Sequence, residues 1–206
     1  MYYGERFNST SHLAGLVLAL ASASLLIPHV VARSDDGWHI VSCAIFTVAV
    51  VCVYATSVAY HCARGPGKAV WEKLDHCMIY LLIAATYTSL GLIPLRQEWG
   101  WPLTAAAWTL ALAGIAREIV GWRRPTRPAV PLYVAMGWLG LAAAVPIADS
   151  LAPASLAWLV AGALCYSVGL VFYRQTGRWA HAHGIWHLFV LGGTACHVLM
   201  VWSFLN

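Results

Sequence analysis

The chain has 206 residues, of which 61% are hydrophobic and only 10% are charged, and its formal net charge is +4. A soluble domain carries about 25% charged residues, so this composition excludes an ordinary water-soluble protein. The positive charge does not indicate nucleic-acid binding, because the basic residues stand in short segments between apolar runs. We expect an integral membrane protein that forms a single domain over residues 1–206, since no linker divides it.

Seven apolar runs are long enough to cross a membrane, because a spanning helix needs about 20 mostly apolar residues. The fifth run is interrupted by two prolines and two glycines, which neighbouring helices can tolerate. The pattern predicts an all-α membrane protein, a bundle of seven transmembrane helices. In chain order the runs cover residues 13–32, 40–62, 74–95, 102–121, 130–148, 154–173 and 183–204.

Lysine and arginine are divided unequally between the two sides that seven spans would define. The side of the N-terminus carries ten of them, and the other side carries only Arg33 and Arg96. Cytoplasmic loops hold the excess of such residues. The count therefore predicts a cytoplasmic N-terminus and an external C-terminus in the cell (inner or plasma) membrane. The ten residues are Arg6, Arg64, Lys68, Lys73, Arg117, Arg123, Arg124, Arg127, Arg174 and Arg178.

Two groups of polar residues lie where the second run ends and the third begins. Ionisable groups inside spans are costly and usually mark function. Ser57 and His61 are four residues apart and share one helix face, although such a pair also fits a hydrogen bond in the core. Asp75, with His76 beside it, also fits the N-cap of a helix. Each signal is open to both interpretations by itself.

A third group, His183 and His187, begins the last run. Histidines four residues apart on a helix can converge on one metal ion, although they also fit a membrane interface. The predicted topology places His183 and His187 at the same depth on the cytoplasmic side as His61 and Asp75. His12, at the start of the first run, lies at that depth too. One shared site therefore accounts for these residues. The remaining histidines inside or beside the runs are not assigned to it. His29 and His39 fall on the opposite side, and His197 lies about 15 Å beyond His187, where we expect a buried polar contact.

Three histidines suit Zn²⁺, with a water molecule in the fourth position. A zinc ion held by three histidines of this site would lower the pKa of its bound water to about 7. Asp75 can hold that water and move its proton. Ser57 can donate a hydrogen bond to a substrate carbonyl or orient Asp75. Both are predicted catalytic residues.

At these residues the chain resembles the hemolysin III family, the bacterial branch of the superfamily that contains the adiponectin and progestin receptors. It is more distantly similar to the alkaline ceramidases. The resemblance covers the whole chain and rests on Ser57-x-x-x-His61, on Asp75 and on the stretch from His183 to His197. Glu5, Asn8 and His12 match the family's N-terminal pattern.

The resemblance implies a seven-helix bundle with a cytoplasmic N-terminus. It also implies zinc held by the equivalents of His61, His183 and His187, with Asp75 on the metal-bound water.

These observations lead to three competing functions. The first is a zinc-dependent hydrolase that cleaves a membrane lipid at an amide or ester on the cytoplasmic side. The second is a sensor or receptor with structural zinc. The third is a pore-forming hemolysin, which the sequence supports least, because no span carries a periodic polar stripe beyond the candidate site.

Overall fold

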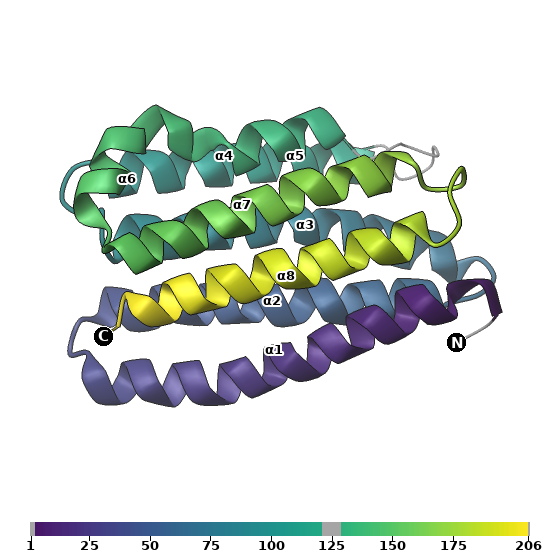
Figure 1. Cartoon of the computed structure of the whole chain (residues 1–206), viewed down its shortest axis with the longest axis horizontal. Helices are drawn as coiled ribbons and strands as arrows, with labels where there is room; N and C mark the ends of the chain where they lie inside the picture. Colours follow the sequence, from purple (N-terminus) through teal and green to yellow (C-terminus); the bar gives the residue numbers. More distant parts are fainter. Residues whose placement is uncertain (1–2, 121–128, 206) are drawn as a thin grey trace.

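The structure is a computed structural model that describes residues 3–120 and 129–205, and every regular element in these residues is helical. The helices coincide with the predicted runs, the fifth of which is divided into three pieces (Figure 1). They are α1 (Arg6–Arg33), α2 (Gly37–Cys62), α3 (Gly67–Leu92), α4 (Gly100–Val120), α5 (Val130–Gly137), α6 (Ala144–Ser150), α7 (Pro153–Arg174) and α8 (Ala182–Ser203), with 3-10 helices η1 (Tyr3–Glu5) and η2 (Leu139–Ala143).

Six of these helical segments are long and apolar enough to cross a membrane: α1, α2, α4, α7, α8 and the combined segment Val130–Ser150. The chain is therefore a multi-pass integral membrane protein. Helix α1 begins at one end of the bundle and α8 finishes at the other, and successive long helices run in opposite directions along the long axis of the bundle (Figure 1).

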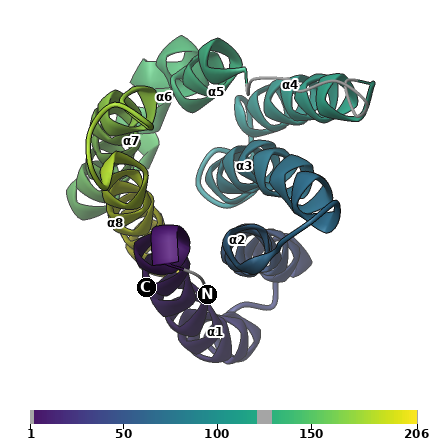
Figure 2. The ribbon, with the colours of Figure 1, turned by 90° about the vertical axis from the view of Figure 1, so that its right-hand side faces the viewer.

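The helix α3 has the same length as α2, 26 residues, but it is more polar than the six apolar segments. Its position explains this composition. It lies between α2 and α4 (Figure 2), and from Ala84 to Leu92 every residue is buried. A helix that is surrounded by protein does not need a surface suited to lipid, so α3 carries hydroxyl groups at Thr86, Thr88 and Ser89. The Thr88 hydroxyl accepts a hydrogen bond from the Trp108 indole of α4 at 2.9 Å.

The helices follow one another around the bundle, and α8 returns to pack beside α1 (Figure 2). Small residues permit the close approach between neighbouring helices. A Cβ atom at Gly15 of α1 would lie 2.6 Å from the Tyr54 ring of α2, and one at Gly193 of α8 would lie 2.7 Å from the Tyr166 ring of α7. Because α1 and α8 meet, the first and last helices contribute to one surface inside the bundle.

The segment Val130–Ser150 is broken at its centre, as the glycines at 137 and 140 predict. Tyr87 of α3 stabilises the break from the side. Its hydroxyl donates to the Gly137 carbonyl at 3.2 Å and accepts from the Gly140 N–H at 2.8 Å. A backbone group without a partner is very costly in lipid, so this contact makes the broken helix compatible with membrane depth.

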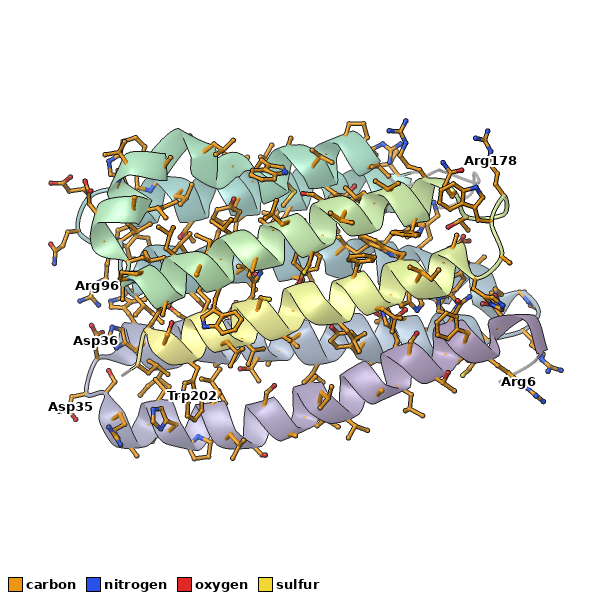
Figure 3. All side chains as sticks on the ribbon, viewed as in Figure 1. Arg6, Asp35, Asp36, Arg96, Arg178 and Trp202 are labelled. Atoms are coloured by element: carbon orange, nitrogen blue, oxygen red, sulfur yellow. The ribbon has the colours of Figure 1, made fainter. Side chains whose placement is uncertain are left out.

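Charged residues gather at the two ends of the bundle. Arg6 and Arg178 lie at the end where the chain begins, whereas Asp35, Asp36 and Arg96 lie at the opposite end (Figure 3). This distribution agrees with the segregation predicted from the sequence. Three residues in that count, Arg123, Arg124 and Arg127, fall outside the described residues.

Candidate metal and catalytic site

Three histidines from two helices converge at the end of the bundle where the chain begins. His61 lies in the last turn of α2, and His183 and His187 lie in the first two turns of α8. One nitrogen atom from each ring lies within 4.8 Å of the other two, and His61 and His187 are buried. The structure thus brings together the three predicted zinc ligands in a cluster that can hold a metal ion.

Hydrogen bonds determine which ring nitrogen is available in two of these histidines. The Nδ1 atom of His61 lies 2.8 Å from Oε2 of Glu5, and that of His187 lies 3.1 Å from the carbonyl oxygen of Asn8. A carboxylate and a carbonyl can only accept, so in both rings Nδ1 carries the hydrogen. The Nε2 lone pair of each ring is therefore left for a ligand.

The donor atoms fit a metal such as zinc. Nε2 of His61 and Nε2 of His183 are buried, and neither has a hydrogen-bond partner within the described ranges. A buried polar atom without a partner costs about 1–3 kcal/mol, and a bound metal ion would remove that cost. Imidazole nitrogen is a preferred ligand of zinc. Ligand histidines typically donate their other N–H to a carboxylate or a carbonyl, as His61 and His187 do here.

The turn before α8 positions His183. The backbone of His181, the residue at the N-cap, has a φ of 60°, which lies in the left-handed region. This conformation is strained for a residue other than glycine, and such strain tends to occur beside functional sites. Nδ1 of His183 lies 3.4 Å from the Thr176 hydroxyl in the same connection.

Ser57 and Asp75 lie beside the histidine cluster, and α1 adds His12 to them. The Ser57 hydroxyl lies 2.6 Å from Nδ1 of His12 and within hydrogen-bonding reach of the Asp75 carboxylate. When the Asp75 carboxylate is ionised it only accepts, and the hydroxyl hydrogen of Ser57 then belongs to Asp75. His12 must then donate from Nδ1. The result is a chain of hydrogen bonds that runs from His12 through Ser57 to Asp75.

Asp75 is not an N-cap, so the structural alternative that the sequence left open is wrong. Helix α3 begins at Gly67, with Pro66 at its N-cap position, and Asp75 lies in its third turn. A carboxylate there makes no capping bond, and its side chain lines the internal cavity. His197, in contrast, lies deep in the bundle as expected, with its ring 5.5 Å from that of Tyr166.

The segment that runs from Glu5 in η1 into the first turns of α1 supplies further contacts. The sequence analysis placed His12 at the site and matched Glu5 and Asn8 to the family pattern, but it did not predict that Glu5, Asn8 or Ser11 contacts the histidines. Glu5 binds His61, and the Asn8 carbonyl and the Ser11 hydroxyl each lie 3.1 Å from Nδ1 of His187. His12 stacks on His187 with the ring centroids 3.6 Å apart. The spacing of Glu5, Asn8 and His12, three and then four residues, places them on one helix face. That periodicity was the signal that could identify them.

The carboxylate of Glu5 is held in its charged form. Its partial burial opposes ionisation, but hydrogen bonds from Lys68, Asn8 and His61 outweigh that effect and lower the pKa of Glu5 to about 2. Lys68 Nζ lies 2.8 Å from Oε1, and Asn8 Nδ2 lies 2.7 Å from Oε2. Glu5 is therefore an anion at neutral pH and a strong hydrogen-bond acceptor for His61.

A second group of charges lies between α3 and α4. Glu118 is completely buried and pairs with Arg117 at 3.0 Å and with Lys73 at 3.5 Å. The His76 ring is 4.0 Å from the same carboxylate. A buried carboxylate is tolerated when it is paired in this way. The sequence analysis did not identify Glu118, although an acidic residue inside an apolar run is a recognisable signal.

A cavity of about 610 Å³ extends from the histidine cluster into the bundle. Ser57, Asp75, His183 and His187 line its polar end. The rest of its wall is largely apolar and comes from α3, α5, α7 and α8, including the residues Leu82, Leu90, Val134, Trp138, Leu159 and Val190. A ligand in this cavity would meet polar groups at one end and hydrocarbon along the remainder.

These features define a class: a multi-pass helical membrane protein with a buried histidine cluster able to hold a metal ion. The haemolysin-III related family matches residues 2–198, and the chain belongs to that family. It is 36% identical to Hemolysin-3 of Bacillus cereus over 192 residues, which cover 93% of this chain and 87% of that protein. It is 38% identical to the Hemolysin-3 homolog of Bacillus subtilis (strain 168), also over 192 residues, with 93% and 89% covered.

A more distant relative is the adiponectin receptor protein of Drosophila melanogaster. The two are 25% identical over 218 residues, which cover 94% of this chain and 49% of the receptor. The chain thus corresponds to about half of that longer protein.

Proposed function

We propose that this protein is a zinc-dependent hydrolase that cleaves an amide or ester bond of a membrane lipid. The observation that carries the proposal is the continuity of the polar site with the apolar cavity. The chemistry would take place at Asp75, Ser57 and the three histidines, while the hydrocarbon chain of the lipid occupies the remainder. An apolar cavity wall favours binding of a hydrocarbon chain over binding of a water-soluble substrate.

His61, His183 and His187 would hold the zinc ion, which would polarise the substrate carbonyl as a Lewis acid and favour ionisation of water. The Asp75 carboxylate accepts the proton of the attacking water while the water oxygen bonds to the carbonyl carbon. The carbon–nitrogen or carbon–oxygen bond then breaks, and Asp75 returns the proton to the leaving amine or alcohol. Ser57, held by His12, orients the carboxylate for both transfers.

We also propose that α3 is a seventh span and that the chain begins in the cytoplasm. Its 26 residues are enough to cross the bilayer, and protein surrounds it. An odd number of spans agrees with termini at opposite ends of the bundle (Figure 1). The site would then lie on the cytoplasmic side of the cell membrane, where lipids of the inner leaflet reach it.

A sensor or receptor is the second candidate, and the name of the Drosophila relative favours it. In a receptor the zinc ion would be structural, and loss of Asp75 would be tolerated. A pore-forming hemolysin, which the names of the Bacillus relatives suggest, should retain lytic activity when all three histidines are replaced.

Lipid hydrolysis tests the proposal directly. Purified protein is incubated with ceramides and phospholipids, and released fatty acid is measured by mass spectrometry before and after removal of zinc by a chelator. We expect release that stops on zinc removal and returns on zinc addition. If zinc is bound and no lipid releases product, the hydrolase proposal is wrong and a receptor is the better-supported function.

A further inference from the structure

The segment Glu5–Asn8, where η1 ends and α1 begins, contacts two of the three histidines from outside the cluster. Glu5 Oε2 lies 2.8 Å from Nδ1 of His61, and the Asn8 carbonyl lies 3.1 Å from Nδ1 of His187. The two histidines belong to α2 and α8, which are far apart in the sequence. Segment Glu5–Asn8 is thus the common support of both rings.

Glu5 is the charged member of that support, and both of its oxygens are engaged. Lys68, the second residue of α3, donates to Oε1 of Glu5 at 2.8 Å. Asn8 and His61 both donate to Oε2 of Glu5. Lys68 also lies 4.8 Å from the centre of the Tyr60 ring. These contacts hold the carboxylate in one orientation, so that it can fix the orientation of the His61 ring in turn.

We propose that Glu5 is the positioning residue of the metal centre: its carboxylate keeps His61 protonated on Nδ1 and directs the Nε2 lone pair toward His183 and His187. The inference rests on the proposed metal site and adds to it the residue that prepares one ligand for binding. Glu5 itself does not contact the metal.

Two physical effects follow from this arrangement. A hydrogen bond from Nδ1–H to an anion makes the ring a more basic ligand, and the fixed ring plane reduces the entropy lost when the metal binds. Replacing such a partner of a ligand histidine typically weakens metal affinity by about 10–100-fold. A glutamine at this position can still accept a hydrogen bond, but it lacks the charge.

The test measures zinc affinity in purified full-length protein that has been stripped of metal, by competition with a chromophoric chelator. Glu5→Gln should raise the zinc Kd by about 10–100-fold. Glu5→Asp keeps the charge but is shorter and should have an intermediate Kd. Glu98→Gln makes the same chemical change in the α3–α4 connection, at the opposite end of the bundle, and should leave the Kd within about twofold of the wild type.

The melting temperature of each metal-free protein separates positioning from folding. Equal melting temperatures together with a weakened zinc Kd in Glu5→Gln support the inference. An unchanged Kd in Glu5→Gln overturns it while the metal site itself stands. If Glu5→Gln cannot be purified, the Kd of Glu5→Asp decides: weakened affinity supports the inference, and wild-type affinity overturns it. Failure of the wild type to bind zinc overturns both this inference and the proposed zinc site.

Discussion

His12 of α1 stacks face to face on His187 of α8, with ring centroids 3.6 Å apart and ring planes 13° from parallel. The contact joins the first long helix to the last and closes the bundle around the candidate site. The same His12 ring bonds to Ser57 of α2. One residue of α1 therefore links the predicted metal ligand His187 to the predicted catalytic pair.

The first prediction concerns the metal ion. Purified protein should contain about one zinc ion per chain, as expected for a single three-histidine site. His61→Ala, His183→Ala and His187→Ala should each remove most of it, because two histidines hold zinc much less tightly than three. Elemental analysis measures the content. His29→Ala serves as the control and should bind zinc normally, whereas full occupancy in the His183/His187 double variant would end the proposal.

The second prediction separates the role of Asp75 from metal binding. Asp75→Asn has nearly the same size and can still hydrogen-bond to water, but it cannot accept the proton of that water. General-base catalysis contributes about 10²–10⁴-fold, so lipid hydrolysis should fall by a factor in that range while zinc content stays near that of the wild type. Ser57→Ala should also keep its zinc and lose less activity.

Zinc content and product release are measured on the same samples of these two variants. If Asp75→Asn loses zinc together with activity, Asp75 is a metal ligand and the assigned proton transfer is wrong.

The third prediction concerns orientation. Because lysine and arginine divide ten to two between the sides, a reporter fused after Asn206 should be external. An enzyme that folds only outside the cytoplasm should be active in this fusion, and a fluorescent protein that requires the cytoplasm should be dark. The opposite pair of signals would reverse the orientation and move the candidate site to the outer leaflet.

The fourth prediction concerns the broken helix. Tyr87→Phe removes the hydroxyl that bonds to both Gly137 and Gly140. A buried group left without a partner costs about 1–3 kcal/mol, so the variant should melt at a lower temperature with its zinc content intact. Equal stability of Tyr87→Phe and wild type would show that water replaces the hydroxyl.

The fifth prediction concerns acid stability at the other end of the bundle. A hydrogen bond from the Trp38 backbone N–H, together with the Arg96 guanidinium, lowers the pKa of Asp36. A lowered pKa stabilises the folded state at pH values above the unfolded pKa of about 3.9, and this contribution disappears as the pH falls through the folded pKa. Asp36→Asn should therefore melt below the wild type at neutral pH and approach it in acid.

Asparagine can also cap a helix, so Asp36→Asn isolates the effect of the charge. Arg96→Gln should reproduce the trend, and a difference in melting temperature that stays constant with pH would contradict it.

The sequence by itself determined the helices, the membrane setting and the family. These properties depend on hydropathy and on short motifs, because the bilayer requires a certain length of apolar residues and restricts where charges lie. The spacing of His183 and His187 similarly predicts two rings on one helix face. The break in Val130–Ser150 also followed from composition, since proline and glycine weaken a helix locally.

Only the tertiary structure decided which side chains surround the site. Hydropathy reports on the surrounding solvent and not on the rotation of one helix against another, which depends on contacts such as Gly15 with Tyr54. The bond between Ser11 and His187, 176 residues apart in the sequence, arises because α8 returns beside α1. The bond between Glu5 and His61 arises because the end of α2 lies beside the segment where η1 passes into α1. The burial of Glu118 likewise depends on α4 packing against α3, and nothing in the local sequence encodes that pairing.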